Sequence, residues 1–309
     1  MSSSDCVRIV LGSYNGEKYL AEQLDSILSG TYQNIHIEIS DDGSTDRTLE
    51  ISQKYVDNNP GRVEIHKNQT NMGYVKNFLY GLKRSKEKYT MFCDQDDIWM
   101  PDKVQVTLDK MKRLEQEAGD LPMLVFTDAM LYNGETKEEM GSFHKTSHLD
   151  TDKTDLAHLF MENKCIGCTV MVNSHVIPYL KEIPEQVRVH DWWLALICAS
   201  FGKIGYVSKP TLEYRQHSGN MIGSTSFFSY FMNRIRSFKE QKQVLRRSIL
   251  QGRAFYEMYG NQLEGQAKEV AKEFSTLDTK SFFGRRRNCI RFGFLKSGLT
   301  RNVGLFILI

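Results

Sequence analysis

The sequence predicts an α/β fold in which a mostly parallel sheet is flanked by helices on both faces. Up to Thr127, short apolar runs alternate with segments whose apolar residues recur at helical spacing, which is typical of a parallel sheet. Polar segments that suit chemistry follow directly after strands, and ligands bind at that edge of an open α/β sheet. Beyond Ser224 the pattern becomes helical and amphipathic. We therefore expect a main domain over residues 1–222 and a helical C-terminal region over residues 223–309.

The individual elements follow from the same periodicities. Residues 35–39, for example, alternate apolar and polar side chains as a strand does. We expect strands at residues 7–11, 35–39, 62–66, 89–93, 123–127, 168–172, 204–207 and 211–214. We expect helices at residues 19–28, 48–56, 74–82, 101–118 and 191–201. The pattern loosens over the polar residues 133–153, which predict a long surface loop.

Charge is distributed unevenly along the chain. The formal net charge is only +2, yet residues 231–309 hold 16 basic and 6 acidic side chains, against 24 and 32 in the remainder. This asymmetry indicates an acidic body that holds a metal and a basic region that holds something anionic. Nucleic acid is not expected as a partner, because no recognised binding module accompanies the basic charge.

The composition is that of an ordinary soluble protein, with 40% hydrophobic and 25% charged residues. The first residues have neither a charged segment nor an apolar core, so no signal peptide is expected, and the apolar run 305–309 is too short to span a membrane. Six scattered cysteines in mostly apolar surroundings are typical of a reducing cytoplasm. Cys165 and Cys168 have zinc-ligand spacing, but without a second pair we expect a buried turn there.

Three carboxylates stand within four positions, at Asp94, Asp96 and Asp97, directly after the apolar strand at 89–93. Like charges this close repel one another, and a fold keeps them together when a cation neutralises them. Oxygen ligands suit Mg²⁺ or Mn²⁺, which usually retain open positions for substrate phosphates. The alternative is a helix-capping loop, in which Asp97 or Asp102 caps the following helix.

A second acidic segment, residues 41–46, lies between a strand and a helix. Gly43 permits a tight turn, and Ser44 or Thr45 can cap the helix. One acidic side chain here can accept hydrogen bonds from a base or a ribose hydroxyl; the alternative is a capped turn and nothing more. Neither a GxGxxG nor a GxxxxGK[ST] loop is present, which disfavours dinucleotide-binding and P-loop folds.

The order and spacing of these motifs resemble the family 2 glycosyltransferases of the GT-A fold over about residues 5–222. The matching segments are residues 13–16, 41–46, 71–73 with Asn77, 94–99, 167–168, 190–193 and 214–217. Residues 94–99 and 214–217 further resemble the bacterial rhamnosyltransferase-like branch, which builds surface polysaccharides.

The resemblance implies a role for individual residues. Asp42 would contact the nucleobase of a nucleotide-sugar, while Asp41 shapes the turn. The other donor-binding residues would be Tyr14, Asn15, Asn71, Gly73, Lys76, Asp94 and Arg215. Asp94 and Asp96 would form the DxD pair that holds Mn²⁺ or Mg²⁺, with His217 as a further ligand. Asp191 would be the catalytic base, and the acceptor side would include Trp99, Gly167, Cys168 and Trp192. For Arg215, a structural ion pair is the alternative to a phosphate contact.

The expected chemistry is consistent with these assignments. Breaking the bond between a sugar and a diphosphate leaves negative charge on the leaving group, which a divalent cation stabilises. The acceptor hydroxyl attacks from the opposite face, and one carboxylate takes its proton. A single base without a paired nucleophile predicts inversion. Aromatic neighbours would raise the pKa of Asp191 and a helix N-terminus would lower it, while the alternative for Asp191 is an N-cap.

The C-terminal residues 281–309 combine six basic residues and no acidic residue with an interleaved set of apolar ones. The basic residues are Arg285, Arg286, Arg287, Arg291, Lys296 and Arg301. This composition predicts an amphipathic element on an anionic membrane surface. Packing on the catalytic domain and a homo-oligomer interface are the alternatives.

We therefore expect an inverting, metal-dependent hexosyltransferase in the cytoplasm, peripherally associated with the inner face of the cell membrane. The resemblance favours dTDP-L-rhamnose as donor, with a UDP-sugar as alternative, and a growing, lipid-linked saccharide as acceptor. A haloacid-dehalogenase-like phosphatase also uses a DxD pair, but after its first strand. A different class is a catalytically silent sugar-nucleotide-binding or scaffold protein.

Overall fold

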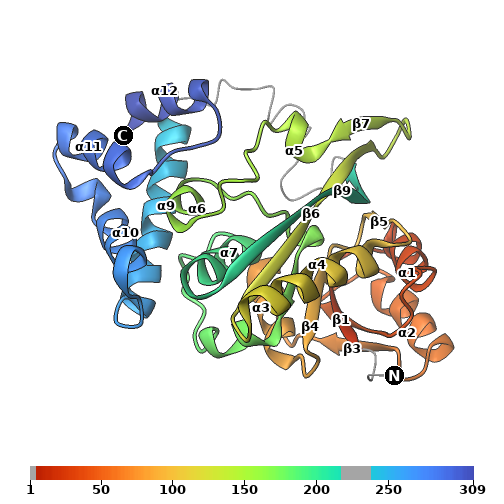
Figure 1. Cartoon of the computed structure of the whole chain (residues 1–309). Helices are drawn as coiled ribbons and strands as arrows, with labels where there is room; N and C mark the ends of the chain where they lie inside the picture. Colours follow the sequence, from red (N-terminus) through yellow and green to blue (C-terminus); the bar gives the residue numbers. More distant parts are fainter. Residues whose placement is uncertain (1–4, 217–237) are drawn as a thin grey trace.

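The computed structural model describes residues 5–216 and 238–309 (Figure 1). Within these residues, strands form one sheet in the order β3-β2-β1-β4-β8-β6-β9-β5, and β7 pairs with β6. The strands are β1 Val7–Ser13, β2 Ile35–Asp41, β3 Val63–Lys67, β4 Tyr89–Cys93, β5 Ile98–Trp99, β6 Met123–Asn133, β7 Glu139–Ser142, β8 Met171–Asn173 and β9 Lys203–Gln216. Strands β3, β2, β1 and β4 are mutually parallel, whereas β8 runs antiparallel to β4 and β6. The sheet is therefore mixed, with a parallel block at its N-terminal half.

The helices are α1 Leu20–Leu28, α2 Thr48–Asn58, α3 Tyr74–Arg84, α4 Lys103–Ala118, α5 Phe143–Thr146, α6 Leu156–Met161, α7 His190–Phe201, α9 Phe238–Tyr259, α10 Gly265–Ser275, α11 Phe282–Phe292 and α12 Leu299–Leu308. Helices lie on both faces of this sheet, and α9–α12 form a further group beside α6 and α7 (Figure 1). Two expected strands, 204–207 and 211–214, are one continuous strand, because β9 pairs with β6 over almost its full length. The expected loop at 133–153 contains β7 and α5.

Strands β1 and β4 are buried almost throughout, which explains their nearly continuous apolar sequences, whereas β2 and β3 alternate apolar and polar residues. In β1, Val10 belongs to a core that includes α3, α6 and α7. Its neighbours Ile9 and Leu11 belong to a second core that includes α1 and α4. Side chains alternate between the faces of a strand, so one short segment contributes to both cores.

The C-terminal helices pack on α6 and α7 and share the first of these two cores. Phe274 of α10 stacks on Phe160 of α6 with ring centroids 4.6 Å apart, and Phe255 of α9 lies 5.4 Å from Trp193 of α7. Figure 1 shows α9–α12 as one group beside α6 and α7. The expected division near residue 222 lies outside the described residues and stays a prediction.

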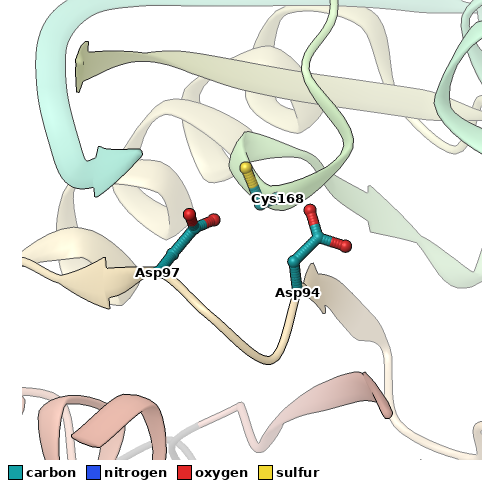
Figure 2. A group of neighbouring side chains, drawn as sticks. All are labelled: Asp94, Asp97 and Cys168. Carbon is teal, nitrogen blue, oxygen red and sulfur yellow. The ribbon is translucent and has the colours of Figure 1, made fainter. Parts of the chain in front are cut away.

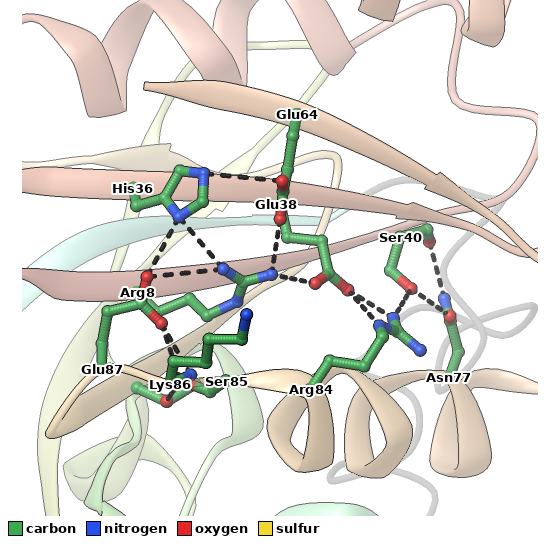
Figure 3. Close-up of polar contacts among 11 residues, drawn as sticks. Arg8, His36, Glu38, Ser40, Glu64, Asn77, Arg84, Ser85, Lys86 and Glu87 are labelled. Carbon is green, nitrogen blue, oxygen red and sulfur yellow. Dashed lines mark hydrogen bonds and ion pairs between the residues drawn. The ribbon is translucent and has the colours of Figure 1, made fainter. Parts of the chain in front are cut away.

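A network of charged side chains connects the parallel strands near their amino ends (Figure 3). The buried Arg8 of β1 pairs with Glu38 of β2 and, at 2.7 Å, with Glu64 of β3. Arg84 at the end of α3 binds the same Glu38, with Nε 3.1 Å from Oε1. Because these charges neutralise one another, the network joins strands and helix without requiring a ligand.

The carboxyl ends of β1, β2 and β4 meet at the opposite edge. Ser13 pairs with Asp41, and Leu11 pairs with Cys93, so these strands end almost level. The loops 14–16, 42–46 and 94–97 therefore emerge side by side. This edge carries the candidate site.

Candidate active site

The turn after β2 is held by the carboxylate of Asp41, which is fully buried. Its Oδ1 accepts hydrogen bonds from the backbone N–H groups of Gly43 at 3.1 Å and Ser44 at 3.0 Å. Its Oδ2 accepts one from the Ser13 hydroxyl at 3.2 Å. Gly43 has φ +88°, which an L side chain rarely adopts. Asp41 thus has the geometry expected of a residue that shapes this turn.

Asp42 binds the next loop. Its carboxylate accepts hydrogen bonds from the Asn68 side chain at 2.9 Å and from the backbone N–H groups of Met72 at 2.9 Å and Gly73 at 2.8 Å. Gly73, with φ +81°, is the N-cap residue of helix α3. Its N–H also donates to the side-chain oxygen of Asn71 at 3.1 Å. A nucleobase contact by Asp42 would share oxygens that already have partners.

The loop after β1 joins the two acidic segments. Asn15 donates its N–H to Ser44 at 2.9 Å and accepts from the N–H of Thr45 at 2.8 Å. The Gln95 side chain binds the backbone of Tyr14 twice, accepting its N–H at 2.9 Å and donating to its carbonyl at 3.1 Å. The Tyr14 ring itself is 49% exposed at the edge of the sheet. Gln95 was not expected as a site residue; its only sequence signal was its place between the aspartates.

The loop after β4 forms a cluster of possible metal ligands (Figure 2). Asp94, Asp97 and Cys168 each offer one ligand atom, and these atoms lie within 4.8 Å of one another. Asp97 is 1% exposed, and its Oδ1 accepts the N–H of Arg215 at 3.1 Å. Among the described residues, Asp97 Oδ2 accepts no N–H or O–H group, and the Cys168 thiol lies beside it. The thiol is a weak donor to Asp97, and a buried carboxylate with so few donors is costly unless something else binds it.

The electrostatics of this cluster also favour a cation. Burial and the nearby charges of Asp96 and Asp191 together raise the pKa of Asp94 to about 7. Burial, Asp96 and Asp94 raise the pKa of Asp97 well above its usual range. The fully buried Lys103 lies near the cluster, but its Nζ donates to Thr211 at 3.1 Å, and burial lowers its pKa to about 8. Negative charge is therefore in excess here.

The structure changes which aspartate accompanies Asp94. The expected pair was Asp94 and Asp96, but the carboxylate that shares the cluster with Asp94 is that of Asp97. Asp97 is not a helix cap, because α4 begins after Asp102, which makes no side-chain capping bond either. The metal role expected for Asp96 stays a prediction. His217 lies outside the described residues.

Arg215 anchors the same loop from β9. Its Nε donates to the carbonyl of Asp96 at 2.8 Å, and its guanidinium pairs with Glu22 at 2.6 Å. The guanidinium also covers the ring of Tyr19, with 4.7 Å between the Cζ atom and the ring centroid. Of the two expected roles of Arg215, the structural ion pair is present. A phosphate contact stays a prediction.

Asp191, the expected base, is the second residue of α7 and is buried. The N-cap of that helix is Val189, so the capping alternative does not hold. The Asn163 side chain donates to Asp191 Oδ1 at 3.1 Å, and the N–H of Trp192 donates to the same oxygen. Burial nevertheless dominates these bonds and raises the pKa of Asp191 to about 7. Because the charge of Asp191 also raises the pKa of Asp94, the expected base lies near the carboxylate cluster.

Gly167 lies where a side chain would not fit. A Cβ there would stand 2.7 Å from the His190 ring and 3.4 Å from Asp191 Oδ2. The His190 ring packs on Phe78 with centroids 4.3 Å apart, and burial lowers its pKa to about 3. A larger residue than Gly167 would therefore displace the His190 ring and crowd the carboxylate of Asp191.

Other expected residues are less favourably placed. Trp99 and Trp192 are 4% and 5% exposed, so neither ring offers an open face to an acceptor. The Trp192 indole donates to the carbonyl of Leu159. Lys76 pairs with the exposed Glu185 at 2.8 Å. Direct acceptor or donor contacts by these three residues receive no support from the geometry.

Tyr74 is a site residue that the sequence reasoning missed. Its hydroxyl donates to the carbonyl of Arg188 at 3.2 Å, next to the start of α7. Burial and the charges of Asp191 and Asp94 raise the pKa of Tyr74, so the phenol lies near both carboxylates. Its position directly after Gly73 was the available signal.

Sequence comparisons relate this chain to glycosyltransferases. Residues 8–156 match the model of the family described as Glycosyl transferase family 2. A dTDP-rhamnosyl transferase, RfbG of Shigella flexneri, is 28% identical over 230 residues, which are 71% of this chain and 75% of the relative. An uncharacterized glycosyltransferase of Haemophilus influenzae is 26% identical over 72% of this chain and 69% of its own length.

Two solved structures share the fold at low sequence identity. Residues 1–349 of Staphylococcus aureus TarS, in complex with UDP-GlcNAc, are 14% identical with a TM-score of 0.56, covering 93% of this chain and 92% of that one. The mannosyltransferase PcManGT of Pyrobaculum calidifontis, in complex with GDP-Man and Mn²⁺, is 11% identical with a TM-score of 0.54, covering 99% and 84%. The expected GT-A fold is confirmed. This chain is a glycosyltransferase, and its residues 8–156 belong to glycosyl transferase family 2.

Proposed function

We propose that this glycosyltransferase is inverting and metal-dependent, and that it moves a sugar from a nucleoside diphosphate to a hydroxyl group of a growing saccharide. One observation carries the proposal. A carboxylate cluster, in which one buried oxygen of Asp97 accepts no N–H or O–H group among the described residues, lies near a separate buried carboxylate, Asp191. The first suits a cation and a diphosphate, and the second suits a base.

The residues present fit a divalent cation. Asp94 and Asp97 would hold Mn²⁺ or Mg²⁺ through oxygen atoms, with the Cys168 thiol at the edge of the group. Asp96 and His217 remain proposed ligands. The cation would neutralise the charge that develops on the departing diphosphate. Relief of repulsion between Asp94 and Asp97 supports this assignment.

Asp191 would take the proton of the acceptor hydroxyl. A base is most effective when its pKa lies near the working pH, and burial brings the pKa of Asp191 to about 7. The Asn163 side chain fixes one oxygen of the carboxylate and leaves the other, Oδ2, on the side of Gly167. Because the metal cluster is committed to the diphosphate, one base remains for the acceptor. This division supports a single displacement with inversion.

For the donor we propose dTDP-L-rhamnose, which the likeness to the Shigella transferase supports. A UDP-sugar is the alternative, since TarS shares the fold and was solved with UDP-GlcNAc. The nucleoside would lie over the loop 14–16, where the exposed Tyr14 ring offers a stacking face. Asn15, Asp41, Asp42, Asn71 and Gly73 form the hydrogen-bonded frame beneath it.

The acceptor would be a lipid-linked saccharide at the inner face of the cell membrane, with the enzyme in the cytoplasm and peripherally bound. Within residues 5–216 and 238–309, no helix has the length and apolar character needed to cross a bilayer. The basic C-terminal region supports a membrane surface as partner. A homo-oligomer remains a second use of this region.

A donor panel tests the proposal. Nucleotide-sugars are first screened by thermal shift with and without Mn²⁺, and donor turnover is then measured for wild type and Asp191→Asn. We expect the largest shift with dTDP-L-rhamnose plus Mn²⁺, and we expect Asp191→Asn to bind the donor but lose turnover. Full activity in Asp191→Asn would refute the base assignment. Wild-type binding without turnover of any donor would favour a silent sugar-nucleotide-binding protein.

A further inference from the structure

Exposed apolar side chains gather on the last two helices. Among the described residues, eight large apolar side chains are exposed, and two of them, Tyr14 and Tyr80, lie elsewhere. The other six lie on α11 and α12: Phe282, Phe283, Ile290, Leu299, Val303 and Ile307. Phe283 is 79% exposed and Leu299 is 80% exposed. This concentration marks an interaction surface.

Each helix has one packed face and one apolar outer face. In α11, Phe283, Arg287 and Ile290 follow at helical spacing on one side, whereas Cys289 is fully buried. In α12, Leu299, Val303 and Ile307 recur every fourth residue, whereas Leu305 is buried. The outer apolar residues therefore do not contribute to the core, because other side chains of each helix already pack against it.

The charged side chains that this segment itself carries have one sign. Residues 281–309 include six basic and no acidic side chains. Arg286 is committed to the fold, since its guanidinium donates to the carbonyls of Ile309 at 2.7 Å and Phe306 at 2.6 Å. Arg287 and Arg291 are exposed and have no acidic partner within the part of the chain that the structure describes. They remain available to an external anion.

We propose that α11 and α12 form a docking surface for an anionic lipid bilayer. We call this surface the α11–α12 face; it consists of Phe282, Phe283, Arg287, Ile290, Arg291, Leu299, Val303 and Ile307. The apolar side chains enter the boundary between headgroups and acyl chains, and the arginines bind lipid phosphates. A second copy of the chain fits less well, because a self-complementary contact would bring like charges together. The inference rests on the proposed function in that the acceptor is membrane-borne.

The face is connected to the expected base through a short series of contacts. The backbone N–H of Ser297, just before α12, donates to Glu162 at 3.0 Å, and Arg301 of α12 pairs with Glu162 at 2.9 Å. The next residue, Asn163, donates to Asp191. A bilayer bound to α12 therefore lies on a segment that is anchored next to Asp191. This connection would hold the acceptor side of the site close to a lipid-borne saccharide.

Vesicle co-sedimentation of the full chain tests the proposal. The probes are phosphatidylcholine vesicles and the same vesicles containing phosphatidylglycerol. The variants are Phe283→Ser/Ile290→Ser and Arg287→Gln/Arg291→Gln. Tyr80→Ser and Lys54→Gln, exposed residues outside the face, serve as matched controls.

We expect wild type and both controls to bind the anionic vesicles and to bind neutral ones much more weakly. Loss of two arginines should weaken anionic binding roughly 25-fold, at about 1 kcal/mol per residue. The serine pair should reduce binding to both kinds of vesicle. Turnover of a soluble acceptor should stay unchanged in all four variants.

Equal binding by the face variants and wild type would overturn the proposal, as would absence of wild-type binding to anionic vesicles. A wild-type dimer in sedimentation velocity that Phe283→Ser/Ile290→Ser dissociates, without vesicle binding, would assign the face to self-association instead. Vesicle binding without any glycosyl transfer would leave the surface in place and refute the proposed acceptor chemistry.

Discussion

Two acidic loops leave the same edge of the sheet, and they differ in how their carboxylates are satisfied. In the loop 41–46, Asp41 and Asp42 accept hydrogen bonds from several backbone and side-chain donors. In the loop 94–97, Asp97 Oδ2 accepts no N–H or O–H group within the described ranges, and the pKa of Asp94 is raised to about 7. The first loop is complete without a ligand. The second has an excess of carboxylates, which the proposed cation would neutralise.

The difference arises from the surroundings of the two loops. Backbone N–H groups after β2 donate to its two aspartates, and they belong to Gly43, Ser44 and Gly73. Both glycines have a positive φ. Around β4, the neighbours are further carboxylates, a thiol and one buried lysine. Similar acidic sequences therefore have different surroundings, which fit a structural role for the loop 41–46 and the proposed cation-binding role for the loop 94–97.

The largest effect is expected from Asp94→Asn. Turnover should fall roughly 100-fold or more, because a cation at a leaving group contributes several kcal/mol. The melting temperature without metal should be unchanged or higher, because the substitution removes repulsion with Asp97. Steady-state kinetics and thermal unfolding on the same preparation check both. A destabilised variant with normal turnover would show that Asp94, like Asp41, has a structural role, and would contradict the proposed difference between the two loops.

Asp41→Asn provides the opposite case. An amide replaces one of the two accepting oxygens of Asp41 by an NH2 group, so either the bonds from Gly43 and Ser44 or the bond from Ser13 would be lost. The folded state should therefore lose about 1–3 kcal/mol. Urea unfolding followed by circular dichroism measures this loss. Mn²⁺ binding should persist at temperatures where the variant is folded. An unchanged unfolding midpoint would contradict the structural role.

The pH dependence of turnover extends the comparison to Asp191. The base must be ionised to accept a proton, and burial raises its pKa to about 7. Turnover should therefore fall about tenfold per pH unit below that value and level off above it. A pH–rate profile of wild type measures this limb. A profile that is flat from pH 5 to 8 would show that no group with Asp191's raised pKa controls the reaction.

The smallest effect is expected from Asn163→Ala. The lost hydrogen bond favours ionised Asp191, so its removal should move the acidic limb of the profile to higher pH. At neutral pH turnover should fall roughly fivefold, with little change in donor KM. Equal losses at every pH would indicate a structural role for Asn163 alone.

Much of the donor side could be predicted from sequence because its signals are local. Strands β1, β2 and β4 and the acidic loops that follow them are contiguous in the chain, so periodicity and turn residues identify them. The loop predicted to bind a metal contains two of the three clustered side chains, Asp94 and Asp97, and its metal binding stays a prediction. The choice of Asp97 over Asp96 depends on how the loop turns toward β5 and on Cys168, which is 71 positions away from Asp97.

The geometry of the expected acceptor side was harder to predict from sequence, since it depends on long-range packing. The burial of Trp99 and Trp192 follows from core contacts that single-sequence patterns do not reveal. The bond between Asn163 and Asp191 and the contact of Tyr74 with Arg188 join distant segments. For the C-terminal region, sequence indicated basic and apolar residues, and the fold showed which of them face outward.

The most direct test of the central claim is a Mn²⁺ titration of wild type, Asp94→Asn and Asp41→Asn in the presence of dTDP, with free Mn²⁺ followed by its electron paramagnetic resonance signal. Wild type and Asp41→Asn should bind Mn²⁺ with similar affinity, and Asp94→Asn should bind at least about tenfold more weakly. Equal affinity in wild type and Asp94→Asn would contradict the assignment of the 94–97 loop as the cation site.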